Sequence, residues 1–271
     1  SFWQSLGSPK KFNLVELGSG NGEMMKVLIK SLKNFPDCFN SCEPIIHEKS
    51  PLLIKIQKKR LFQSKVKWIS KINKLKKIPS IFIANEFFDA LAIKQFRKEN
   101  GLWFEKFVNF QTINKAYFFE KKVNIKKIEK KINFKISNKQ NFIEYSELGF
   151  DYLRNIAKII KKNTGGLLLI DYGFNEKKMK NTLQAISNHK FANILENIGN
   201  VDITHNINFN LFERFTKKIG GLETNLTTQK EFLLKMGINE RAEIISKNQS
   251  FLKKTDTFFR LKRLVDEKHM S

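Results

Sequence analysis

The chain has 271 residues, of which 41% are hydrophobic and 28% are charged, a length that suits one elaborated domain or two small ones. This composition excludes a disordered, collagen-like or coiled-coil chain, and no apolar run approaches the 18 residues of a membrane-spanning helix. The net charge is +24, but 43 of the 50 basic residues are Lys and they are scattered. We interpret this charge as a solvated basic surface rather than a nucleic-acid groove.

The ends of the chain and its cysteines give two further expectations. Cys38 and Cys42 are too few for a disulfide framework, and with four histidines and no CxxC pair we expect no metal site. The chain begins at Ser1 rather than at a methionine, and the aromatic pair Phe2-Trp3 follows at once. We therefore expect that an N-terminal segment is missing, and no cleavable leader is visible.

The first third of the chain alternates strand and helix patterns. Apolar runs predict strands over Phe12–Leu17 and residues 45–48, 66–69 and 81–84. Helical spacing predicts a helix over residues 24–32 and another over residues 51–61, with Ser50 as its cap. Such alternation is typical of a mostly parallel, doubly wound α/β sheet.

The pattern changes between residues 93 and 146, where alternating segments at 103–110 and 117–123 predict an antiparallel insertion with a hairpin turn at Asn100-Gly101. Its lysine-rich part, residues 121–139, alternates polar and apolar residues and predicts two faces.

The remainder returns to the earlier pattern. We expect a helix over residues 148–160 that stops at Gly165-Gly166, a strand over residues 167–173 that is buried on both faces, an irregular segment to residue 208, and helices over residues 211–219 and 229–264.

Glycines cluster directly after the first predicted strand, in the sequence Glu16-Leu17-Gly18-Ser19-Gly20-Asn21-Gly22. Glycine lets the backbone turn sharply and approach a ligand closely, and the next helix offers its free amide groups. A dinucleotide fingerprint would need glycine at position 23, where Glu23 would repel a pyrophosphate. The spacing is instead that of S-adenosylmethionine-binding turns, and a turn without a ligand is the alternative.

Acidic residues follow two further strands, at the sheet edge where open α/β folds bind ligands. Glu48 can accept hydrogen bonds from both hydroxyls of a ribose, or it can be a carboxylate at the entry of the helix capped by Ser50. Asn85-Glu86-Phe87-Phe88-Asp89-Ala90 follows the fourth strand, and its carboxylates and rings could clamp a guanidinium or ammonium group. The alternative is that these carboxylates cap a helix.

Seven stretches resemble the MidA family of methyltransferases, and they follow the family's order through nearly the whole chain. They are residues 15–22 (VELGSGNG), 47–53 (HEKSPLL) followed by Gln57, 83–96 (IANEFFDALAIKQF), 166–173 (GLLLIDYG), 182–189 (TLQAISNH), 202–209 (DITHNINF) and 228–242 (TQKEFLLKMGINERA). The long segment with which the family normally begins is absent.

The resemblance implies a class I methyltransferase fold, which is Rossmann-like, with S-adenosylmethionine as the methyl donor. Residues 1–92 would form the cofactor-binding half, residues 93–146 a substrate-side antiparallel insertion, and residues 147–271 the remainder with its C-terminal helices. The implied cofactor-binding residues are Glu16, Gly18, Gly20 and Gly22 for the methionine part and Glu48 for the ribose. The implied catalytic residues are Glu86, which would orient a substrate guanidinium, Asn85 and, as a second carboxylate, Asp89.

The implied function is methylation of an arginine in a protein substrate, such as a subunit of respiratory complex I during its assembly. A non-catalytic assembly factor that binds S-adenosylmethionine is one alternative, and a nucleic-acid methyltransferase is a less favoured one. The expected compartment is the cytoplasm, or the mitochondrial matrix if the chain is eukaryotic. Family members carry their histidine one position after His205 and an acid at Asn208, so we interpret His205 as a loop histidine bonded to backbone, with a catalytic role as the alternative.

Overall fold

The computed structural model describes residues 2–112, 115–187, 190–197 and 199–266. It divides the chain into two compact units, Ser1–Leu222 and Glu223–Ser271. Three sequence expectations begin or end outside the described residues: the region predicted over residues 1–92 begins at residue 1, the matching stretch at residues 182–189 ends in residues 188–189, and the region predicted over residues 147–271 ends in residues 267–271. The boundaries proposed at residues 92/93 and 146/147 stay a prediction.

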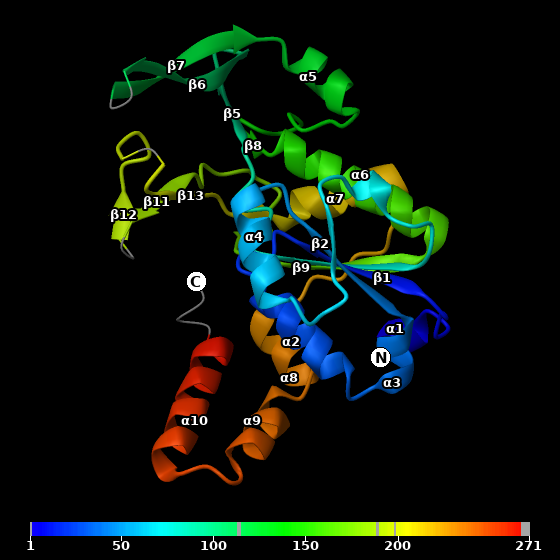
Figure 1. Cartoon of the computed structure of the whole chain (residues 1–271). Helices are drawn as coiled ribbons and strands as arrows, with labels where there is room; N and C mark the ends of the chain where they lie inside the picture. Colours follow the sequence, from blue (N-terminus) through cyan, green and yellow to red (C-terminus); the bar gives the residue numbers. More distant parts are fainter. Residues whose placement is uncertain (1, 113–114, 188–189, 198, 267–271) are drawn as a thin grey trace. The chain divides into compact units, whose positions relative to one another are not determined.

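A parallel sheet of five strands forms the centre of the first unit (Figure 1). Its strands are β1 (Phe12–Leu17), β2 (Cys42–His47), β3 (Lys67–Ile69), β4 (Ser80–Asn85) and β9 (Gly165–Ile170). They lie in the order β3-β2-β1-β4-β9, and every neighbouring pair is parallel. The predicted α/β class with a mostly parallel sheet is therefore confirmed, and the carboxyl ends of all five strands meet at one edge.

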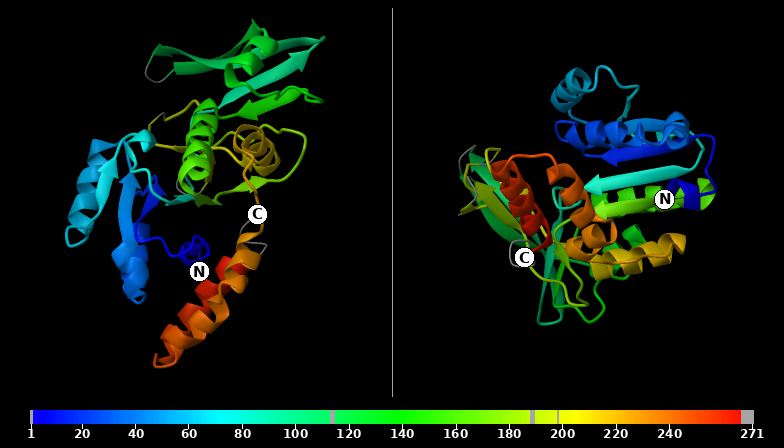
Figure 2. Two further views of the ribbon diagram at one scale, coloured as in Figure 1. Left: turned by 90° about the vertical axis from the view of Figure 1, so that its right-hand side faces the viewer. Right: turned by 90° about the horizontal axis from the view of Figure 1, so that it is seen from below.

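Helices cover both faces of this sheet. They are α1 (Phe2–Ser5), α2 (Glu23–Leu32), α3 (Pro36–Ser41), α4 (Pro51–Arg60), α6 (Glu147–Asn163) and α7 (Phe209–Gly220), with one turn of 3₁₀ helix at Ile72–Lys74. Alternate residues of β1 face opposite ways: Leu14 packs in a cluster with Leu28 of α2, whereas Val15 packs in the cluster that holds α6 and α7. Figure 2 shows the sheet between its helices.

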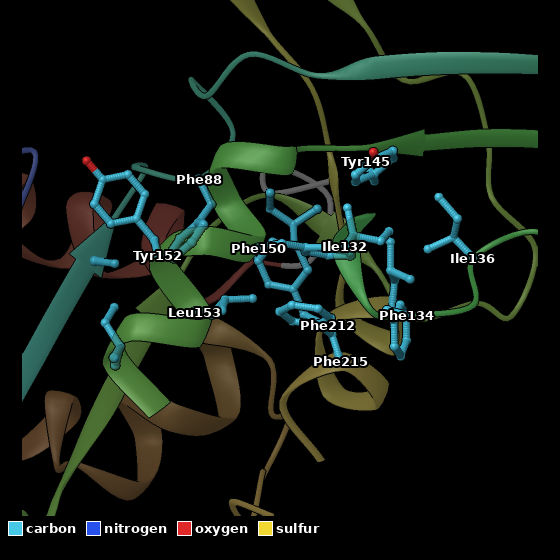
Figure 3. Packing of buried hydrophobic residues seen from close by; sticks show 14 of the residues in the cluster. Phe88, Ile132, Phe134, Ile136, Tyr145, Phe150, Tyr152, Leu153, Phe212 and Phe215 are labelled. Carbon is cyan, nitrogen blue, oxygen red and sulfur yellow. The ribbon is translucent and has the colours of Figure 1, made fainter. Parts of the chain in front are cut away.

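Aromatic rings dominate the larger of these clusters (Figure 3). Phe150 of α6 stacks on Phe215 of α7 with ring centroids 3.9 Å apart, and Phe134 meets both rings edge-on. Phe212 of α7 packs edge-on against Phe88, which lies just after β4. Each fully buried ring stabilises the fold by about 1.5–3 kcal/mol, so this cluster ties α6 and α7 to the segment that follows β4.

The region between β4 and α6 forms an antiparallel sheet, as predicted. Its strands are β5 (Lys94–Glu99), β6 (Leu102–Thr112), β7 (Lys115–Val123) and β8 (Phe142–Tyr145), in the order β7-β6-β5-β8. Asn100 and Gly101 join β5 to β6 with left-handed φ angles of 47° and 79°, which the expected tight turn requires. The lysine-rich stretch contains helix α5 (Ile125–Ile132), which the alternating pattern did not predict; Ile125 and Ile132 are its buried residues.

Helix α6 ends at Asn163, ahead of Gly165 and Gly166 as predicted, and these two glycines begin β9. Position 165 requires glycine because a Cβ there would lie 1.9 Å from the carbonyl oxygen of Ser80 on β4. One expectation about this strand is wrong: it is not buried on both faces, since Leu168 is 37% exposed. Within the described residues, β9 is an edge strand of the central sheet and pairs only with β4.

The segment predicted to be irregular holds five short strands. They are β10 (Gly173–Phe174), β11 (Gln184–Ser187), β12 (Lys190–Ala192), β13 (Asp202–Thr204) and β14 (Ile207–Asn208). β11 pairs with β12 and β13 in an antiparallel sheet, and β10 pairs with β14 in parallel.

The second unit is helical, as expected for residues 229–264. It contains α8 (Gln229–Lys235), α9 (Ile238–Ser246) and α10 (Phe251–Val265). A capping box starts α8, because the Thr228 side chain accepts from the Glu231 amide while the Glu231 side chain accepts from the Thr228 amide.

Candidate functional site

The glycine turn leaves β1 at the carboxyl edge of the central sheet and leads into α2. Gly18, Gly20 and Gly22 all adopt left-handed φ angles, of 63°, 50° and 86°. Residues with a side chain rarely adopt this conformation, which accounts for glycine at these positions. A Cβ at Gly20 would meet nothing within 4 Å, so the backbone there is open to a ligand.

Glu16 is the penultimate residue of β1, just before the glycines, and only 2% of its surface is exposed. Burial raises the pKa of its carboxyl group. Its Oε2 atom is buried without a hydrogen-bond partner. A buried carboxylate oxygen of this kind is unfavourable until a donor reaches it, and a cationic group is the donor that suits it best.

Glu48 follows β2 at the same edge. Its Oε1 accepts the backbone N–H groups of Lys49, at 2.8 Å, and Ser50, at 2.9 Å. Ser50 in turn caps α4 by accepting from the Leu53 amide. Oε1 of Glu48 thus binds the backbone at the entry of α4, which is the alternative role considered for this carboxylate. The other oxygen, Oε2, accepts a single hydrogen bond, from Gln57 at 3.3 Å. An ionised carboxylate oxygen accepts two hydrogen bonds, so Oε2 retains capacity for a ribose hydroxyl.

The acidic segment begins with Asn85, the last residue of β4. Glu86 is exposed and has a left-handed φ angle of 46°, which a residue with a side chain adopts only where its surroundings hold it. The Glu86 amide donates to the carbonyl oxygen of Ile170, the last residue of β9, at 2.9 Å. Asp89 is 7% exposed, and its Oδ1 is buried without a partner. Neither carboxylate caps a described helix.

Asp171 holds this segment in place, a role that sequence analysis did not assign. Its Oδ2 accepts the amides of Phe88, at 3.1 Å, and Asp89, at 3.2 Å. Burial, followed by the negative charge of Asp89, raises the pKa of Asp171 to about 7. Burial, followed by the negative charge of Glu86, raises the pKa of the neighbouring Tyr172 hydroxyl. The sequence signal that could have identified Asp171 is its position, because it directly follows an apolar strand at the carboxyl edge of the central sheet.

Phe87 brings the glycine turn and the acidic segment together. A Cβ at Gly18 would lie 2.6 Å from its ring, and the ring packs edge-on against Tyr152 of α6 with centroids 5.0 Å apart. Tyr152 Oη lies 2.8 Å from His47 Nε2, and His47 Nδ1 lies 3.1 Å from the Ile69 carbonyl oxygen. A carbonyl can only accept, so Nδ1 carries the proton and Nε2 accepts from Tyr152.

His205 lies beside the acidic segment, is 5% exposed, and lines a small cavity together with Glu144 and Asn208. Its backbone amide donates to the Asp89 carbonyl oxygen at 3.2 Å, and its ring also bonds to the Asp89 backbone. Burial lowers the pKa of His205 to about 4, so its ring is neutral at physiological pH. This geometry is that of a loop histidine bonded to backbone.

Within residues 2–112, 115–187, 190–197 and 199–266, no group of three or more His, Cys, Asp or Glu side chains is arranged to hold a metal ion. No helix in the same residues combines the length and the apolar character needed to cross a bilayer.

Comparisons with known proteins agree with the sequence resemblance. Residues 1–228 match the family described as "Putative S-adenosyl-L-methionine-dependent methyltransferase". The chain is 27% identical to Protein arginine methyltransferase NDUFAF7, mitochondrial, of Xenopus tropicalis over 92% of its length, and 28% identical to the NDUFAF7 homolog of Caenorhabditis elegans over 87%. It spans only 63% and 60% of those two relatives.

A solved structure supports the fold. The chain superposes with a TM-score of 0.76 on a Burkholderia thailandensis protein crystallised with S-adenosyl-homocysteine. The two share 20% sequence identity, and the match covers 99% of this chain and 71% of the other. The family match confirms S-adenosylmethionine as the cofactor class and the resemblance to the MidA type. The parallel sheet and the glycine turn agree with this match. The chain therefore belongs to the S-adenosylmethionine-dependent methyltransferase family that residues 1–228 match.

Proposed function

We propose that the protein binds S-adenosylmethionine at the carboxyl edge of the central sheet and methylates an arginine side chain of a protein substrate. The observation that supports this most directly is a pair of buried carboxylate oxygens without partners, Glu16 Oε2 on β1 and Asp89 Oδ1 just after β4. These strands are neighbours in the sheet. Two cationic ligands, an ammonium and a guanidinium, would satisfy the two carboxylates.

The residues of the edge fit the cofactor. Glu16 would bind the ammonium group of its methionine part, the turn through Gly18, Gly20 and Gly22 would let its backbone approach, and Glu48 Oε2 would accept from the ribose. When bound, S-adenosylmethionine supplies a methyl group on a positively charged sulfur. The open space beside Gly20 and the unpartnered oxygen of Glu16 support this assignment.

The acidic segment fits a guanidinium. Glu86 is exposed, and its backbone is held to β9 through Ile170, so its carboxylate stands at the edge rather than in the core. Hydrogen bonds from a guanidinium to Glu86 would hold the positive charge on the far nitrogens and orient the attacking one. Asn85 would face the reacting groups, and Asp89 would be the second carboxylate.

The names of the relatives support an arginine in a protein as the substrate, since they are named protein arginine methyltransferases. Their names also place them in mitochondria. For this protein, a subunit of respiratory complex I as the target and the cytoplasm or mitochondrial matrix as the compartment remain predictions from the resemblance.

Glu86→Gln in the complete protein tests the role of the carboxylate. Because Gln keeps the shape of Glu and removes its charge, methylation should fall at least about 100-fold while S-adenosyl-homocysteine binds within twofold of its original affinity. Mass spectrometry of complex I subunits incubated with the enzyme measures methylation, and calorimetry measures the affinity for S-adenosyl-homocysteine. Glu176→Gln, at an exposed residue paired with Lys180, is the matched control and should change neither.

Two results would contradict the proposal. Loss of cofactor binding in Glu86→Gln would mean that the carboxylate does not serve the substrate. Tight binding of S-adenosyl-homocysteine without methylation of any protein would favour the non-catalytic assembly factor instead.

A further inference from the structure

Gln57 is a fully buried polar residue on α4, with 0% of its surface exposed. Its side chain joins three segments that are distant in sequence. Nε2 donates to the carbonyl oxygen of Gly20, at 2.9 Å, and to Glu48 Oε2, at 3.3 Å. Oε1 accepts from the indole N–H of Trp68 on β3, at 2.9 Å.

The chemistry of these partners allows only one orientation of the amide. The Gly20 carbonyl and the Glu48 carboxylate can only accept, and the Trp68 indole can only donate. Rotating the amide by 180° would place an oxygen against two oxygens and an NH₂ group against an N–H. Both Nε2 protons and the Oε1 atom of Gln57 are therefore used, and the side chain is locked.

The result is a fixed link between the glycine turn and Glu48. The backbone amides of Lys49 and Ser50 hold one oxygen of Glu48, and Gln57 holds the other. The same Nε2 atom holds the Gly20 carbonyl, so the turn and the carboxylate are bound to one rigid group.

We propose that Gln57 is a positioning residue for the cofactor, which sets the Glu48 carboxylate and the glycine turn at the separation that the ribose and methionine parts require. The inference rests on the proposed binding of S-adenosylmethionine at this edge. A site organised before its ligand arrives does not lose affinity to the ordering of its own side chains. Gln57 would thus act through Glu48 and Gly20 without touching the cofactor.

The packing around Gln57 allows a substitution that removes only its hydrogen bonds. A Cβ at Gly22 would lie 3.4 Å from Gln57 Cγ, so the aliphatic part of the side chain also supports the turn. Methionine has a similar length and volume, and Gln57→Met therefore keeps this contact while removing the amide. Gln63→Met is the matched control, because Gln63 is exposed just beyond the same helix.

The test is calorimetric titration of the whole chain and its variants with S-adenosyl-homocysteine, together with amide hydrogen exchange at residues 49–50. We expect Gln57→Met to raise Kd about tenfold, as the loss of a supporting hydrogen-bond shell does at other ligand sites, and to speed exchange at residues 49–50. In a Glu48→Ala background the same substitution should raise Kd by a smaller factor, about threefold, because only the glycine turn remains of the two groups that Gln57 positions. Gln63→Met should change neither quantity.

An unchanged Kd in Gln57→Met, or an equal loss with and without Glu48, would overturn the inference while leaving the proposed function intact. If the unsubstituted chain does not bind S-adenosyl-homocysteine, the proposed function itself fails, and the inference fails with it. Circular dichroism establishes that each variant is folded. Should Gln57→Met unfold, Gln57→Asn, whose shorter amide cannot reach Gly20 and Glu48 together, takes its place with the same expected result.

Discussion

Gly18 offers a direct test of the contact that joins the glycine turn to the acidic segment. Gly18→Ala adds one methyl group at a φ of 63°, 2.6 Å from Cδ2 of Phe87. The left-handed conformation alone costs about 1–2 kcal/mol for a residue with a Cβ. Non-bonded carbon atoms do not approach to 2.6 Å, so the ring of Phe87 must also move.

The cost of moving that ring follows from its neighbours. Phe87 packs edge-on against Phe88, at 5.3 Å, and Tyr152, at 5.0 Å. Aromatic pairs contribute about 0.5–1.5 kcal/mol each beyond their buried area, so displacement from both partners adds about 1–3 kcal/mol. Gly18→Ala should therefore lower the free energy of unfolding by roughly 2–5 kcal/mol.

Gly20→Ala is the matched control, because its φ of 50° is also left-handed but its Cβ would meet nothing within 4 Å. It should cost only the backbone part, about 1–2 kcal/mol. Urea unfolding followed by circular dichroism measures both variants. Equal destabilisation of the two would refute the close contact, as would a persisting difference between them once Phe87→Ala has removed the ring.

Two further predictions concern buried polar groups near the site. The pKa of Asp171 is raised from 3.8 to about 7, so the folded state binds more protons than the unfolded state between these values and the free energy of unfolding should fall as pH rises from about 4 to 7. Asp171→Asn should flatten this decline, which is on the order of 4 kcal/mol, in urea titrations at several pH values; an unchanged slope would refute the shift. Tyr152→Phe leaves the buried Nε2 of His47 without its donor and should cost about 1–2 kcal/mol, whereas Tyr117→Phe on the exposed hairpin should cost under about 0.5 kcal/mol in the same assay. Equal costs would show that the bond to His47 contributes little.

The central strands were predictable because burial on both faces leaves an unbroken apolar run in the sequence. β4 holds such a run at residues 81–84, and β1 is fully buried although it contains Asn13 and Glu16; the bounds of both strands lie within one residue of the prediction. β9 has the same apolar sequence, yet its exposure depends on which strands pair with it, and that is a property of the assembled sheet. α5 was missed because its apolar residues are outnumbered by lysines, so the helical spacing of Ile125, Ile128 and Ile132 was interpreted as simple alternation.

The residues of the site were predictable where each one lies at the end of a strand or directly after it. Glu16, Glu48 and Glu86 could be assigned to one edge because parallel strands all end there. The supporting residues could not be found in this way. Gln57 lies in the middle of a helix, and Asp171 binds amides 82 and 83 residues earlier in the chain, so their partners exist only in the folded protein.

The pairing of β5 with β8 has a consequence for how the chain folds. Lys94 lies opposite Tyr145, so the antiparallel sheet leaves the central fold just after β4 and returns to it just before α6. Residues opposite each other in such a pair have Cα atoms only about 5 Å apart. Once this sheet has formed, the connection from β4 to β9 behaves as a loop less than half as long, which lowers the entropic cost of closing it by about 1 kcal/mol. The antiparallel sheet therefore shortens the search for the last parallel strand, and variation in the length of its outer hairpin would leave that closure unaffected.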